Sequence, residues 1–116
     1  MSTIKSFKDL VVWQKARDLA SEIYKLTEKF PKSETYGLAS QMQRAAVSIS
    51  SNIAEGYHKF SKKDKDRFLS MAYGSAAELE SQLEIAKILY PTLKYEKIDG
   101  LLMETMKILN KFLHDG

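Results

Sequence analysis

The chain has 116 residues with a formal net charge of +3 and no cysteine, and 44% of its residues are hydrophobic and 28% charged. This length predicts a single domain spanning residues 1–116, with enough apolar residues to form a core and enough charge to stay in solution. The lack of cysteine excludes a disulfide framework and a thiolate metal site, and it fits a cytoplasmic location. No apolar run is long enough to predict a signal peptide or a membrane span.

The first half of the chain predicts two amphipathic helices, at about residues 8–30 and 35–57. Ser6 and Asp9 have the spacing of a capping box, and Pro31 ends the first helix. In the second helix, Gly56 is expected to act as a left-handed stop. The apolar positions with helical spacing are Val12, Ala16, Leu19, Ile23, Leu26 and Phe30 in the first helix, and Met42, Ala45, Ala46, Ile49 and Ile53 in the second.

The second half predicts two more helices, at about 62–90 and 94–113. Ser61 and Asp64 form another capping-box pattern, and Pro91 ends the third helix. Gly74 lies inside that helix, and its cost in helix stability suggests the close approach of another helix. The apolar stripes are Phe68, Leu69, Ala72, Ala76, Leu79, Leu83 and Ala86 in the third helix, and Ile98, Leu102, Thr105, Leu109 and Phe112 in the fourth.

These elements define the expected fold class. The chain shows no strand pattern, no internal repeat and no low-complexity segment. Four helices joined by short turns pack with their sequence neighbours in antiparallel orientation. The sequence therefore predicts an all-α protein, a single antiparallel up-down-up-down four-helix bundle.

The helix at 35–57 also carries a polar stripe, with short hydrogen-bonding side chains around a lone arginine. Such a composition favours a close helix contact with paired polar groups. Across the hairpin with the third helix, Arg44 is level with Glu78, and Glu55 with Arg67. The candidate network comprises Arg44, Ser48, Asn52, Glu55, Ser75, Glu78 and Gln82. It is expected to fix helix register or an oligomer contact; a ligand or nucleic-acid site and a solvated surface remain alternatives.

The positive charge is concentrated around the turn between the second and third helices. Residues 59–67 contain five basic and two acidic residues, a net charge of +3 that equals that of the whole chain. The candidate nucleic-acid-binding residues are Lys59, Lys62, Lys63, Lys65 and Arg67. In an up-down bundle both termini lie at the same end as this turn, which adds Lys5, Lys8, Lys107 and Lys111. Tyr57 and Phe60 are placed to stack on bases. Lysine-rich turns also simply keep bundles soluble, which is the alternative.

Catalytic and cofactor patterns are missing from the sequence. His58 and His114 are the only histidines, and neither has the spacing to acidic residues that metal-binding helices show. No glycine-rich phosphate loop is present, and no serine has a base close in sequence. We therefore expect a protein that is not an enzyme and that has no metal or cofactor.

Several runs together carry a family resemblance over about residues 7–89. They are FKDLVVWQKA, the pair Phe30-Pro31, YGLASQ, RAAVSISSNIAEG and GSAAELESQLEIAK, in this order. The chain resembles the bacterial 23S ribosomal RNA intervening-sequence proteins, a four-helix-bundle family to which the accessory variability determinant of diversity-generating retroelements is similar. The resemblance implies a bundle that assembles into a homopentamer, and it brings no catalytic residues. The retroelement relative implies binding to nucleic acid and to a reverse transcriptase through basic surface.

Two hypotheses for function follow. The first is a non-enzymatic homo-oligomeric scaffold that binds RNA or DNA through the basic end around the turn between the second and third helices. The alternative is a protein–protein adaptor with no nucleic-acid binding of its own, for which a reverse transcriptase is one possible partner.

Overall fold

The computed structural model describes residues 3–115, which form four α-helices and two short 3₁₀ helices. The α-helices are α1 (Val11–Thr27), α2 (Leu38–Tyr57), α3 (Lys62–Leu89) and α4 (Glu96–Asp115), and the 3₁₀ helices are η1 (Phe7–Asp9) and η2 (Lys32–Glu34). No strand occurs in residues 3–115. The prediction of an all-α fold is confirmed.

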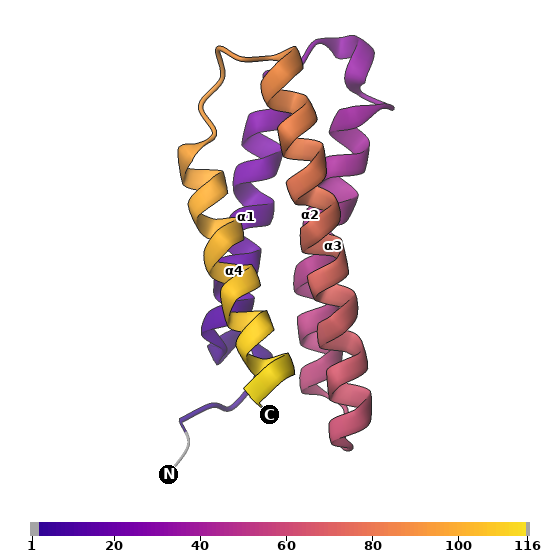
Figure 1. Cartoon of the computed structure of the whole chain (residues 1–116), viewed down its shortest axis with the longest axis vertical. Coiled ribbons are helices and arrows are strands. Elements are labelled where there is room, and N and C mark those ends of the chain that lie inside the picture. Colours follow the sequence, from indigo (N-terminus) through magenta and orange to yellow (C-terminus); the bar gives the residue numbers. More distant parts are fainter. Residues whose placement is uncertain (1–2, 116) are drawn as a thin grey trace.

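The four helices form an antiparallel up-down-up-down bundle (Figure 1). Each helix packs against its sequence neighbours, and α1 also contacts α4, which closes the bundle. The most extensive contact joins α2 and α3, and the least extensive joins α3 and α4. The α2–α3 turn lies at the same end of the bundle as both chain termini, and the other two connections lie at the opposite end (Figure 1).

One apolar stripe from each helix fills the core, as the spacing predicts. The largest fully buried apolar side chains are Leu19, Ile23, Met42, Ile49, Ile53, Leu79, Leu83 and Leu109. The two buried threonines are satisfied locally: the hydroxyl of Thr105 donates to the carbonyl of Leu101 at 2.7 Å, and that of Thr27 to the carbonyl of Ile23 at 2.9 Å. Phe112 is the exception among the predicted core positions of α4, because its side chain is 47% exposed at the helix end.

The first helix is shorter than the 8–30 expected. The Ser6 capping box forms, but it caps the 3₁₀ turn η1, and α1 begins only at Val11. At the other end α1 stops at Thr27, ahead of Phe30, because a residue before proline is pushed away from helical geometry. Gly37 likewise precedes α2, and a carboxylate oxygen of Glu34 accepts from the backbone N–H of Leu38 at 3.3 Å.

Two glycines have roles different from those expected. No glycine among residues 3–115 has a positive φ, so Gly56 is not a left-handed stop and α2 continues through it to Tyr57. A Cβ at Gly56 would instead lie 3.4 Å from the carbonyl oxygen of Lys65, so this is where α2 and α3 approach closely. A Cβ at Gly74 would meet nothing within 4 Å, and the expected close approach there does not occur within the single chain.

Candidate nucleic-acid interface

The basic end is the end of the bundle that holds the α2–α3 turn and both termini. Its cations come from η1 and the residues before it, from the turn, from the first turns of α3 and from the last turns of α4 (Figure 1). They are Lys5, Lys8, Lys59, Lys62, Lys63, Lys65, Arg67, Lys107 and Lys111. The fold thus brings together residues that are more than 100 positions apart in the sequence.

Three of the candidate lysines are engaged with neighbouring groups of the chain. Lys59 forms an ion pair with Glu55 at 3.7 Å, and Lys62 pairs with Asp66 at 2.6 Å. The Lys65 ammonium donates to the carbonyl oxygens of Tyr57 and Gly56 at 3.1 and 3.4 Å. Lys65 therefore caps the C-terminus of α2, where a cation complements the negative end of the helix dipole.

Other cations of this end have no carboxylate partner. Within residues 3–115, no ion pair involves Lys5, Lys8, Lys63, Lys107 or Lys111. Arg67 lies over the ring of Phe68, with its guanidinium carbon 4.8 Å from the ring centroid. The charge of these groups is not offset by a neighbouring carboxylate among the described residues, in contrast to that of Lys59 and Lys62.

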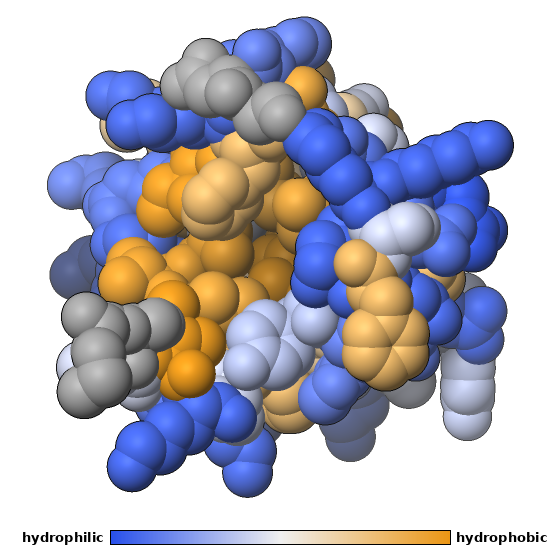
Figure 2. All heavy atoms as spheres, turned by 90° about the horizontal axis from the view of Figure 1, so that it is seen from below, coloured by the Kyte–Doolittle hydropathy of each residue, from blue (hydrophilic) through white to orange (hydrophobic). Residues whose placement is uncertain are grey.

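An apolar hollow opens at the centre of the basic end. Figure 2 looks onto this end and shows a hydrophobic surface surrounded by hydrophilic side chains. The hollow has a volume of about 230 Å³ and is lined by Leu10, Val12, Ile53, Tyr57, Leu69 and Phe112, with Lys62, Lys65 and Asp66 at its side. Sequence reasoning missed it, because its walls come from all four helices and no single helix contains the pattern.

Aromatic side chains lie among the cations of the turn. Phe60 is 101% exposed, which means that its ring is as open to solvent as in an extended peptide. Tyr57 is half-buried, and its ring meets that of His58 edge-on at 5.4 Å between centroids. His58 in turn packs edge-on against Phe7 at 5.9 Å, which joins the turn to η1.

The structure brings together only the centre of the candidate polar network. The hydroxyls of Ser48 and Ser75 are 2.8 Å apart across α2 and α3, and the Asn52 amide donates to the Ser48 hydroxyl at 3.1 Å. Arg44 and Glu78 are both exposed, and no ion pair joins them within the described residues. Glu55 pairs with Lys59 rather than with Arg67.

Gln82, another member of this network, is expected to reduce the stability of the fold in a way that can be measured. Its side chain is buried, and among the described residues its Oε1 has no hydrogen-bond partner. Leaving a buried acceptor unpaired costs about 1–3 kcal/mol. Replacing Gln82 by methionine, which is similar in size, is therefore expected to raise the free energy of unfolding by ~1 kcal/mol and the melting temperature by several degrees.

Thermal unfolding followed by circular dichroism measures this effect. Gln41→Met is the matched control, because Gln41 is exposed on α2 and its replacement should leave the melting temperature unchanged. A fall in stability for Gln82→Met would show instead that the Gln82 amide binds a group outside the single chain.

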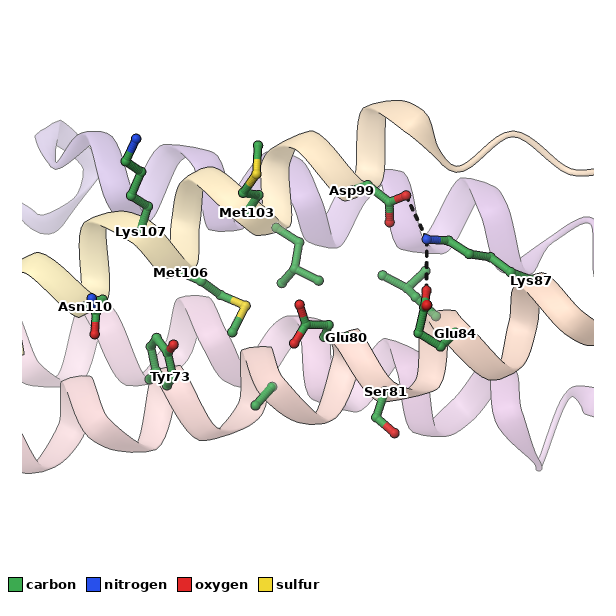
Figure 3. A pocket seen from close by; sticks show the side chains of 13 residues that line it. Tyr73, Glu80, Ser81, Glu84, Lys87, Asp99, Met103, Met106, Lys107 and Asn110 are labelled. Carbon is green, nitrogen blue, oxygen red and sulfur yellow. Dashed lines mark hydrogen bonds and ion pairs between the residues drawn. The ribbon is translucent and has the colours of Figure 1, made fainter.

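A second groove lies between α3 and α4 (Figure 3), the pair of neighbouring helices with the least extensive contact. It has a volume of about 730 Å³, and Met103 and Met106 contribute apolar surface to it. At one end, the ammonium of Lys87 lies 2.8 Å from Asp99 and 3.0 Å from Glu84. The hydrogen bond to Asp99, and to a smaller extent that to Glu84, raises the pKa of Lys87, so this lysine stays protonated. Its ion pair with Asp99 links α3 to α4.

The titratable groups form no metal-binding arrangement in residues 3–115. In the same range, no helix has the length and apolar character needed to cross a membrane. The fold and the charge distribution thus define an antiparallel four-helix-bundle protein in which the end with the α2–α3 turn carries a cluster of cations.

The family follows from comparison with known proteins. The model of the 23S rRNA-intervening sequence protein family matches residues 8–111, and the chain belongs to this family. The resemblance inferred from the sequence runs is therefore confirmed, and it extends beyond residue 89 to include α4.

A solved structure has the same fold. It is a protein with unknown function from the S23 ribosomal protein family of Bacteroides thetaiotaomicron, and it is 27% identical in sequence with a TM-score of 0.79. The similarity covers 90% of the present chain and 99% of that protein. No curated protein matches the chain significantly.

Proposed function

We propose that this protein is a non-enzymatic scaffold that assembles with copies of itself and binds RNA or DNA through its basic end. One observation carries the proposal: Lys8 from η1, Lys63 from α3 and Lys111 from α4 lie at one end of the bundle, and none of the three has an ion pair within the described residues. Lysines without partners bind phosphates without distinguishing bases, so the binding should show little sequence preference.

Self-association is supported by apolar side chains on the outer surface. Tyr24 and Val47 are 46% and 42% exposed, and they line a groove between α1 and α2 together with Arg44. Burial of such side chains between copies would stabilise an assembly. The resemblance favours five subunits, and the lack of cysteine fits a cytoplasmic location. A ring would repeat the basic end, and linked copies of a weak site raise the overall affinity.

The test is a binding titration with fluorescein-labelled RNA and DNA oligonucleotides of matched sequence, followed by fluorescence anisotropy. Binding through phosphate contacts is expected to weaken steeply between about 50 and 200 mM salt, because each contact releases condensed counterions. Light scattering on the same samples gives the number of subunits. If neither nucleic acid binds at the lowest salt concentration, the proposal is wrong.

The groove between α3 and α4 favours a second candidate, a protein–protein adaptor. Its methionine side chains suit an apolar partner surface, because methionine adapts its shape to different contacts. A partner such as a reverse transcriptase would then supply any chemistry. Pull-down with a Met103→Glu, Met106→Glu variant that still binds oligonucleotides would separate this surface from the basic end.

A further inference from the structure

We propose that the basic end binds nucleic acid as a single strand, with bases stacked on Phe60 and inserted into the apolar hollow between the helix ends. This inference rests on the proposed function, and it specifies which form of nucleic acid the site accepts. It comes from three features of the same end: the fully exposed ring of Phe60, the apolar hollow, and lysines such as Lys63 and Lys111 that have no ion pair among the described residues.

Phe60 contributes nothing to the core. Its ring is 101% exposed, whereas the aromatic side chains of Phe30 and Tyr95 are buried. A phenylalanine at a turn surrounded by lysines offers both faces of its ring to the solvent. Bases stack on such rings regardless of their identity, because every base has a π face.

The hollow provides a second apolar surface beside the turn. Tyr57 and Lys62, on either side of the turn, both contribute to its lining, so the turn that carries Phe60 adjoins the hollow. Its floor is apolar, and hydrophilic side chains stand around it (Figure 2), with Lys62, Lys65 and Asp66 among its lining residues. A base with its attached phosphate has the complementary pattern, an apolar ring joined to an anion.

A duplex does not fit this surface, because its bases are stacked inside the helix and only their edges and the phosphates reach the solvent. A single strand exposes base faces that can be splayed out and stacked on aromatic side chains. The lysines alone would bind both forms, since both carry phosphates. The apolar elements of the basic end therefore favour the single strand.

A second copy of the chain is the competing occupant of the hollow. End-to-end contact of two copies would bring two basic ends together, and like charges placed opposite each other across an interface cost energy. Residues 59–67 alone carry a net charge of +3 on each copy. Charge complementarity thus favours a polyanion over another copy.

The experiment compares three probes of equal length: a single-stranded DNA, the same strand with abasic sites in place of its bases, and the duplex. The parent protein should bind the single strand about tenfold more tightly than the abasic strand, which keeps the phosphates and loses the rings. Phe60→Ala should bind the single strand about tenfold more weakly and should not distinguish it from the abasic strand. Phe112→Ala, at the wall of the hollow, should lose part of the same preference.

Tyr36→Ala is the matched control, since Tyr36 is 97% exposed and lies between η2 and α2 at the opposite end. It should bind like the parent. Phe60→Trp should also retain the preference, because the π face is kept. Circular dichroism checks the folding of each variant.

Each outcome separates the inference from the proposed function. If the parent binds all three probes equally and Phe60→Ala has no effect, the inference is overturned, while the function stands. If Phe60→Ala changes the subunit number in light scattering, the ring belongs to a contact between copies, and the inference is also overturned. If no probe binds, both fail together.

Discussion

Replacing Lys8, Lys63 and Lys111 together by alanine is expected to weaken the binding of a single-stranded oligonucleotide about a hundredfold at about 0.1 M salt. The three lysines are exposed, come from η1, α3 and α4, and have no ion pair among the described residues. Each phosphate contact to a single strand makes the slope of log K against log salt more negative by about 0.7. Three contacts therefore supply about two orders of magnitude between about 1 M and 0.1 M salt.

The matched control removes the same charge from the opposite end. Lys29, Lys32 and Lys94 are also exposed and have no ion pair in residues 3–115, and they lie near the α1–α2 and α3–α4 connections. Their triple alanine variant should bind nearly as tightly as the parent. Equal losses of affinity in the two variants would mean that net charge alone governs binding and that the basic end is not a specific binding site.

A second large effect is expected for Gly56→Leu, which should lower the free energy of unfolding by about 1–3 kcal/mol. A Cβ at this position already lies 3.4 Å from the Lys65 carbonyl oxygen and 3.4 Å from Cβ of Phe68. The further atoms of leucine have no room there, so α2 and α3 must move apart. Chemical denaturation measures the loss.

Two variants identify the cause of this loss. Gly56→Ala should be close to neutral, because its Cβ makes an ordinary contact and alanine has the higher helix propensity. Gly100→Leu introduces the same side chain into α4, where a Cβ meets nothing within 4 Å, and should not destabilise the protein. If Gly56→Leu unfolds like Gly100→Leu, the close packing of α2 against α3 is not what limits this position.

The core was predictable because helical periodicity determines which side chains face inward. Val12, Leu19 and Ile23 in α1 recur at spacings of three and four, and all are buried. The helix ends were harder to predict, because capping side chains and short 3₁₀ turns decide where a helix begins, and helical periodicity does not report them. The Ser6 capping box forms as expected, yet the chain makes a 3₁₀ turn there before α1 begins.

The candidate site was predictable only in part. Residue numbers across a helical hairpin predict which residues lie level along the two helix axes, but they do not predict which way each side chain points around its helix. Ser48 and Ser75 meet across α2 and α3, whereas Arg44 and Glu78 are level but both exposed. The glycines show the same difference: composition around Gly74 suggested a close approach that the structure places at Gly56. Predicting the apolar hollow would have required the relative positions of all four helices, and no local sequence pattern contains them.

The arrangement of the termini has a practical consequence. Both lie at the basic end, so an affinity tag or a fluorescent fusion at either terminus would lie beside the surface proposed to bind nucleic acid (Figure 1). A polyhistidine tag would also add titratable groups to a cationic surface. Labels are better inserted into the connection between α3 and α4, where Thr92 and Lys94 are exposed at the far end. Surface immobilisation through that connection would leave the basic end facing the solution.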